Sequence, residues 1–140
     1  MNIVLSLADF WQSPSHFAAV AEPLVFQLDR CAESIATTRV IPAITALCYA
    51  ASSADHFKAI NTKILQLMRS DSAAVRLTAV KCERSLTDRH GEDWLALLPE
   101  MLPFIVELLE DDDEMVEKET RTWIRSVEDI LGESLEGMLQ

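Results

Sequence analysis

Apolar residues recur along this chain at intervals of three and four, and short polar segments separate the stretches that show this spacing. Such spacing places the apolar side chains on one face of an α-helix. Runs that alternate apolar and polar residues, as half-buried strands do, are absent, and the chain holds only three glycines. The pattern therefore predicts an all-α protein.

The predicted helices fall into three pairs. The first pair covers 14–28 and 37–51, the second lies on either side of a polar turn at 70–72, and the third covers 94–110 and 112–131. The predicted core-facing stripes are, in chain order, Phe17, Val20, Leu24 and Leu28; Ile41, Ile44, Leu47 and Cys48; Phe57, Ile60, Ile64, Leu67 and Met68; Val75, Ala79, Cys82 and Leu86; and Val116, Thr120, Trp123, Ile124, Val127, Ile130 and Leu131.

Prolines, glycines and a small polar residue mark where these helices begin, bend and end. Ser13 followed by Pro14 is typical of a helix N-terminus, because serine caps free N–H groups and proline fits the first helical position. Pro23 lies inside the first helix and is expected to bend it. Gly91 is expected to end the fourth helix in a left-handed conformation, and Gly132 to stop the last one.

The pattern also repeats. Residues 64–75 resemble 105–116 at a shift of 41, and 25–28 match 64–67 at a shift of 39. Self-similarity near 40 residues is typical of helical repeat arrays. We therefore expect a HEAT-like α-solenoid of about three stacked antiparallel hairpins with a C-terminal cap. An array of hairpins has no enclosed active-site cleft, which favours a binding or scaffold function.

We expect residues 1–140 to form a single HEAT-repeat domain. Leu135, Met138 and Leu139 are expected to cover the end of the stack, because terminal repeats need a cap. The apolar start of the chain has the character of a helix cut from a larger array, so the chain is interpreted as the C-terminal fragment of a larger protein. The expected divisions are 1–12 (partial helix), 13–53 (repeat), 54–91 (repeat) and 92–140 (repeat plus cap).

Three further features resemble HEAT repeats. A proline, Pro103, lies inside a helix, each inter-helix turn carries an aspartate, and a basic residue comes early in the second helix of a hairpin. In the HEAT pattern the aspartate and the basic residue help to join neighbouring repeats. The residues concerned are Asp71 and Asp111, and Arg76 and Lys118.

The net charge is −11, and the acidic residues concentrate in the second half of the chain. Residues 87–140 hold 16 acidic and four basic residues, whereas 1–86 hold seven acidic and eight basic residues. An acidic surface repels phosphate backbones, since nucleic-acid affinity rests mainly on lysine and arginine. The charge favours a basic protein partner, and a solvated acidic surface that only aids solubility stays open as the alternative.

The three cysteines, Cys31, Cys48 and Cys82, are widely spaced and form no CxxC pair. Each falls within an apolar helical pattern, where a free thiol behaves as a small hydrophobe, and this favours a reducing compartment. No apolar run approaches the ~20 residues that a membrane span needs, so we expect no membrane partner.

One candidate partner-binding site is the acidic run at the start of the last predicted helix. Carboxylates at that position cap free N–H groups and suit the positive end of the helix dipole. A calcium site alternates its ligands and needs a turn glycine, and this run has neither, so we expect no metal and no other cofactor. Docking of a basic partner stays open beside capping. The run comprises Glu110, Asp111, Asp112, Asp113 and Glu114.

A second candidate partner-binding set is basic: Lys81, Arg84, Arg121 and Arg125. Arg84 and Arg125 are 41 residues apart, so they occupy equivalent places in successive repeats. They could line the concave face of the solenoid and contact RNA phosphate or an acidic peptide. Pairing with Glu83, Glu119 or Glu128 is the favoured alternative, and no aromatic residues interleave to stack bases.

The remaining candidate chemistry is weak. The histidines His16, His56 and His90 are far apart and near predicted helix ends, which favours surface or capping positions. A triad of Asp88, His90 and nearby serines is rejected, because neighbours at one helix end cannot supply its geometry. Trp94 and Trp123 lie on predicted inner stripes and are expected in the core.

One longer string carries a specific resemblance. It comprises Leu86-Thr87-Asp88-Arg89, Gly91-Glu92-Asp93-Trp94-Leu95, Leu98-Pro99, Glu110-Asp111-Asp112-Asp113 and Ile130-Leu131-Gly132. Over roughly 78–139 the chain resembles the extreme C-terminus of a HEAT-repeat family of the small-subunit processome. That family is U3 small nucleolar RNA-associated protein ten, also called HEAT repeat-containing protein one. The segment 37–67 is compatible with it but matches more loosely.

The resemblance implies a non-enzymatic scaffold of the nucleus and nucleolus that acts in pre-18S rRNA processing and ribosome biogenesis. Its implied partners are processome proteins with basic surfaces, and pre-rRNA and the U3 ribonucleoprotein at the level of the complex. It implies no small-molecule substrate, and the family has no catalytic residues to carry over. A HEAT-repeat adaptor from nuclear transport or a phosphatase scaffold is the alternative. A small helical enzyme, the third hypothesis, would need paired titratable groups facing a pocket, and the sequence shows none.

Overall fold

A computed structural model describes residues 14–50 and 53–139, with side chains from Ala19 onward, and within these residues the chain is helical and contains no strand. The all-α prediction is confirmed. The predicted partial helix at 1–12, the Ser13 cap and the side chain of Phe17 lie outside the described part. The elements are α2 (Pro14–Gln27), α3 (Glu33–Ile35), the π-helical η2 (Ala36–Val40), α4 (Ile41–Ala50), α5 (Ala54–Leu67), α6 (Ala73–His90), α7 (Glu92–Leu95), α8 (Leu98–Leu109), α9 (Glu114–Leu131) and the 3₁₀ turn η3 (Glu136–Met138).

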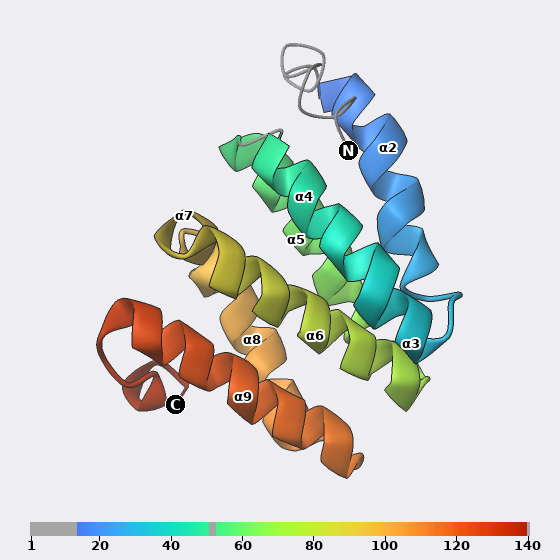
Figure 1. The fold of residues 1–140 in the computed structure, drawn as a ribbon. Helices are drawn as coiled ribbons and strands as arrows, with labels where there is room; N and C mark the ends of the chain where they lie inside the picture. Colours follow the sequence, from blue (N-terminus) through green and yellow to red (C-terminus); the bar gives the residue numbers. More distant parts are fainter. Residues whose placement is uncertain (1–13, 51–52, 140) are drawn as a thin grey trace.

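The helices lie in two layers (Figure 1). α4, α6 and α9 lie side by side in one layer, and α5 and α8 lie behind them. α5 packs on α6 and α8 packs on α9 after short turns, while α2 packs against α4 and α5. None of the helices over 14–50 and 53–139 has both the length and the apolar character that crossing a membrane requires.

One contiguous core runs from α2 to the end of the chain and contains most of the predicted stripe residues. Trp94 and Trp123 are fully buried, as predicted. Leu131 was predicted to face the core but is exposed, because it lies at the C-terminal end of α9. Of the three residues predicted to cover the end of the stack, Leu135 is fully buried, Leu139 is half-buried and Met138 is exposed.

The cysteines are free, and Cys48 and Cys82 lie in the core. Burial, followed by the nearby Glu83 carboxyl, raises the pKa of Cys48 to about 12. The same two causes and Cys48 itself raise the pKa of Cys82. Both thiols are therefore protonated and act as small apolar side chains, while Cys31 is half-buried.

Both glycines that were predicted to end helices have positive φ angles. Gly132 (φ 75°, ψ 15°) adopts the left-handed conformation after α9, and its N–H donates to the Glu128 carbonyl at 2.8 Å. Gly91 has φ 57° but ψ −129°, outside the left-handed helical region. The prediction for Gly91 is therefore wrong in ψ, because this residue both ends α6 and starts α7 directly.

Two predicted helices differ from the observed ones, and proline accounts for both differences. The predicted helix at 94–110 is divided into α7 and α8, because a Pro99 ring in a continuous helix would clash with the Leu95 carbonyl. The predicted helix at 37–51 begins earlier, at Glu33, and passes through the π-helical η2 just before Pro42. The wider π turn leaves room for the Pro42 ring beside the Thr38 carbonyl.

Candidate functional site

The acidic run at 110–114 forms the turn between α8 and α9 and caps α9. Asp113 precedes the helix in an extended conformation, and its Oδ1 accepts the N–H groups of Met115 at 2.9 Å and Val116 at 3.1 Å. These bonds satisfy two of the N–H groups that have no partner within the helix. The capping interpretation of this run is confirmed.

Asp111 ties the acidic turn to the neighbouring hairpin. The Arg76 guanidinium donates to Asp111 Oδ2 at 2.9 Å and Oδ1 at 3.1 Å, and also to the Ser70 carbonyl at 2.8 Å. The N–H of Asp113 donates to Asp111 Oδ1 at 2.9 Å. Partial burial raises the pKa of Asp111, but the bonds from Arg76 and Asp113 outweigh it and leave this pKa below its ordinary value. This pair joins the turn before α6 to the turn before α9.

The other three carboxylates of the run, on Glu110, Asp112 and Glu114, are exposed and form no ion pair with the described residues. These three are the most exposed carboxylates of the run, and their docking function stays a prediction. Within 14–50 and 53–139, no group of three or more His, Cys, Asp and Glu side chains is arranged to hold a metal ion.

Three of the four predicted basic residues are paired. Lys81 Nζ lies 2.6 Å from Glu33, Arg84 Nε lies 2.7 Å from Glu119 on α9, and Arg121 pairs with Glu117 within α9 at 3.1 Å. Arg125 is exposed and has no ion pair in the described part of the chain. Lys118, the second HEAT-like basic residue, is likewise exposed and unpaired within that part.

The expected pairing between repeats is confirmed for Glu119 and wrong for the other two carboxylates. Glu128 instead accepts the N–H of Leu135 at 2.8 Å and so holds the C-terminal segment against α9. Glu83 is fully buried, and its Oε2 accepts the Trp94 Nε1–H at 3.1 Å. Desolvation raises the pKa of Glu83 to about 8, although the bond from Trp94 acts in the opposite direction.

Glu83 belongs to a buried polar network that the sequence analysis missed. The Thr87 hydroxyl donates to the Glu83 backbone carbonyl at 2.8 Å, and the Trp123 Nε1–H donates to Thr87 Oγ1 at 3.1 Å across the α6–α9 contact. A signal was present in the sequence. Two core tryptophans each need an acceptor for the indole N–H, and Glu83 and Thr87 follow Ala79 on the inner face of α6 at intervals of four.

The histidines with described side chains pack inward. The ring of His90 lies 5.0 Å from the Phe57 ring and 6.4 Å from the Trp94 ring, centroid to centroid. Desolvation lowers the pKa of His90, although a backbone hydrogen bond at Thr45 opposes this shift. His56, for which a surface or capping position was expected, is buried. It lies on the inner face of α5, where packing decides its position.

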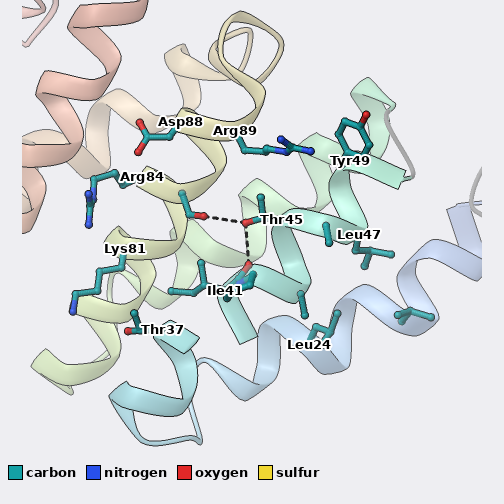
Figure 2. A pocket seen from close by; sticks show the side chains of 15 residues that line it. Leu24, Thr37, Ile41, Thr45, Leu47, Tyr49, Lys81, Arg84, Asp88 and Arg89 are labelled. Atoms are coloured by element: carbon teal, nitrogen blue, oxygen red, sulfur yellow. Dashed lines mark hydrogen bonds between the residues drawn. The ribbon is translucent and has the colours of Figure 1, made fainter. Parts of the chain in front are cut away.

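A groove of about 1010 Å³ lies between α2, α4 and α6. Figure 2 shows Lys81, Arg84, Asp88 and Arg89 following one another along α6, with Arg89 reaching toward Tyr49 of α4. In the base of the groove the hydroxyls of Thr45 and Ser85 are hydrogen-bonded at 3.1 Å. The remaining lining is mostly apolar: Val20, Leu24, Thr37, Ile41, Pro42, Ala43, Ala46 and Leu47.

No family model matches the chain. Curated proteins, however, match it over nearly its whole length. The U3 small nucleolar RNA-associated protein 10 of Phaeosphaeria nodorum is 61% identical over 132 residues, which are 94% of this chain and 8% of that protein. The proteins of the same name from Coccidioides immitis (52% over 143 residues) and Neurospora crassa (53% over 132 residues) also match 94% of the chain, and 8% and 7% of their own lengths.

The chain thus spans less than a tenth of the length of the relatives it matches. Identities of 52–61% over 94% of the chain leave no doubt about the relationship. The string that carried the resemblance begins in α6 and ends at Gly132, directly after α9. This chain belongs to the U3 small nucleolar RNA-associated protein 10 family.

Proposed function

We propose that the chain is a non-enzymatic protein-interaction part of a nucleolar small-subunit processome component. The whole protein would act in pre-18S rRNA processing and ribosome biogenesis, in the nucleus and nucleolus. The observation that carries this proposal is the similarity to relatives that are called U3 small nucleolar RNA-associated protein 10. Since the chain spans about 8% of such a protein, the proposal assigns it a share in the function of the whole.

We also propose that the chain forms one HEAT-like α-solenoid, with repeats at 13–53, 54–91 and 92–140. Side chains about one repeat apart contact each other across hairpins, which supports this arrangement. Thr45 contacts Ser85, and Arg84 contacts Glu119. The bidentate Arg76–Asp111 pair corresponds to the contact that aspartate and a basic residue make between HEAT repeats.

The proposed scaffold function is supported by how the charged groups are used. Glu83 and His90, whose pKa values are shifted, pack in the core against Trp94 and Phe57. The exposed carboxylates of Glu110, Asp112 and Glu114 are instead available to a basic surface of a processome protein. On this proposal, pre-rRNA and the U3 ribonucleoprotein are partners of the complex as a whole.

Affinity purification of the tagged, intact parent protein tests the proposal. We expect recovery of U3 small nucleolar RNA together with early processome proteins. A parent protein that lacks the segment corresponding to this chain, compared at equal expression, would show which of those components depend on it. Recovery of nuclear-transport or phosphatase subunits without U3 RNA would overturn the proposal in favour of an adaptor from another assembly.

A further inference from the structure

We propose that the groove between α2, α4 and α6 binds an amphipathic helical segment of a partner protein. The apolar face of that segment would lie on α2 and α4, and its acidic side chains would face α6. This inference rests on the proposed scaffold function and deepens it, because it states the chemistry of one partner.

The apolar walls come from two helices. Val20 and Leu24 of α2 are half-buried, and Pro42 and Ala46 of α4 are exposed, so apolar side chains reach solvent along the groove. A volume of about 1010 Å³ is at the upper end of the range for small-molecule pockets. The groove also extends over three helices (Figure 2), which suits a peptide segment better than a compact ligand.

The opposite wall, on α6, is mainly cationic. Its charged lining residues are Lys81, Arg84, Arg89 and Asp88; the Arg84 guanidinium is directed to Glu119 of α9, away from α2 and α4, and Arg89 is the cation that reaches across toward α4 (Figure 2). The guanidinium of Arg89 lies over the Tyr49 ring at 4.5 Å and has no carboxylate partner among the described residues. A carboxylate on the bound segment could therefore pair with Arg89 without displacing an existing ion pair.

The two other cations can be shared at little cost. In the Lys81–Glu33 pair the side chains are 22% and 47% exposed, and in the Arg84–Glu119 pair they are 36% and 16% exposed. Ion pairs near the surface contribute little to stability, so a partner carboxylate can join or replace them. The wall thus complements an acidic edge of the bound segment.

The walls favour a helix over an extended peptide or RNA. The hydroxyls of Thr45 and Ser85 are bonded to each other, and Thr45 also donates to the Ile41 carbonyl at 2.9 Å, so the base has few groups to pair with an extended backbone. A helix satisfies its own backbone and offers an apolar face to the groove. Tyr49 is the one aromatic residue among the described lining, and Arg89 covers its face, so bases have no surface to stack on.

Selection from a random peptide library displayed on phage tests the inference, with the purified 140-residue chain as target and peptides of roughly 16 residues, between four and five helical turns. We expect enriched peptides with apolar residues at helical spacing and Asp or Glu along one flank. The probe for measurement is a fluorescein-labelled synthetic copy of one enriched peptide, titrated by fluorescence anisotropy. Enrichment of basic peptides, or of none above background, would overturn the inference.

Variants then locate the site. Ala46→Glu places a carboxylate on the exposed part of the groove, and Arg89→Glu reverses the free cation. Each is expected to weaken binding about tenfold. A probe with lysine in place of its acidic flank should bind Arg89→Glu better than the unaltered chain. Lys118→Glu, an equal charge reversal outside the groove, is the matched control and should leave the dissociation constant unchanged.

Circular dichroism of each variant separates loss of binding from loss of folding, since both changed side chains are exposed. Equal binding by Ala46→Glu and the unaltered chain would place the peptide elsewhere and refute the inference. The inference would also be refuted if single-stranded RNA displaced the peptide and if its binding required Arg89. The proposed function is tested separately, by recovery of U3 RNA with the parent protein. If that recovery persists, the proposed function stands, whether or not the groove binds the peptide.

Discussion

Glu83 is an acidic residue in surroundings that oppose its ionisation. Its carboxyl is fully buried, accepts one hydrogen bond from Trp94, and has a pKa of about 8. Near neutral pH the group is therefore mainly protonated in the folded chain, whereas in the unfolded chain it ionises above its ordinary pKa of 4.5. Folding thus binds a proton between these two values, and stability falls as pH rises through that interval.

We expect the free energy of unfolding to decrease from pH 5 to pH 8, and Glu83→Gln to remove most of that decrease. Glutamine keeps an acceptor for the Trp94 indole and cannot ionise, so the variant should match the unaltered chain near pH 5 and exceed it near pH 8. Urea unfolding at both pH values measures this. Glu117→Gln, which changes the exposed ion pair with Arg121 instead, is the control. Glu83→Gln less stable at both pH values would contradict the prediction.

The residue scale also shows where sequence reasoning ends. The apolar stripes predicted the burial of Trp94 and Trp123 correctly, because helical spacing decides which face each residue occupies. Glu83 lies on the same inner face of α6, but its charge led us to expect it in an ion pair with one of the basic residues. Only the three-dimensional contact with an indole N–H shows why a carboxylic acid is tolerated there.

At the scale of the helix, the acidic turn combines two functions that sequence reasoning could not separate. Asp113 caps α9 and Asp111 binds Arg76, whereas Asp112 is exposed and makes neither contact. The composition of the run predicted an N-terminal cap, but the sequence did not show which of its five successive carboxylates makes the cap. The path of the backbone decides which side chain faces the free N–H groups.

Asp113→Ala should lower the free energy of unfolding by about 1 kcal/mol, the usual cost of losing an N-cap. Asp112→Ala, its matched neighbour, should change it by less than about 0.5 kcal/mol. Chemical denaturation of both variants with the unaltered chain gives the comparison. Equal effects of the two substitutions would mean that the cap contributes nothing measurable.

Arg76 and Asp111 connect two hairpins, and their side chains are only 18% and 8% exposed. Removing either one leaves a partly buried charge without its partner, so Arg76→Ala and Asp111→Ala should each destabilise the chain by about 1–3 kcal/mol. In a double-mutant cycle we expect a coupling of about 1 kcal/mol. Strictly additive effects would show that the pair does not hold the hairpins together. Arg121→Ala, in an exposed pair within α9, serves as the comparison.

Helix boundaries were predicted less well than helix faces. Pro99 divides the predicted helix at 94–110 into α7 and α8, while Pro103 is accommodated inside α8. Both prolines look alike in the sequence. The difference lies in the residues before each proline. Before Pro99, the side chains of Trp94 and Leu95 are buried in the core, and the backbone changes direction after them.

At the scale of the whole molecule, charge is distributed unevenly. The last 54 residues hold 16 of the 23 acidic residues, and part of this charge serves internal contacts at Asp111, Asp113 and Glu119. The overall acidity was evident from composition, but which carboxylates remain accessible follows only from the fold. Likewise the repeat predicted paired helices, whereas the groove arises from how three of them meet.

If the exposed carboxylates dock a basic partner, then combining Glu110→Gln, Asp112→Asn and Glu114→Gln in the parent protein should reduce recovery of its processome partners. The difference from the unaltered protein should be largest at low salt and shrink as the salt concentration rises, because screening also weakens the charge contacts that the unaltered protein makes. Quantitative mass spectrometry of the affinity-purified complex measures it. Unchanged recovery across salt concentrations would assign these residues to the solvated surface alone.

The indole of Trp123 spans the boundary between α9 and α6 through its bond to Thr87, while Trp94 belongs to the segment that follows α6 directly. The intrinsic fluorescence of Trp123 therefore reports on the contact between α9 and α6. Separation of the hairpin α8–α9 from α6 would expose the Trp123 ring to water and shift its emission to longer wavelengths. A variant keeping Trp123 as its sole tryptophan would report detachment of the hairpin α8–α9 in real time, without any attached dye.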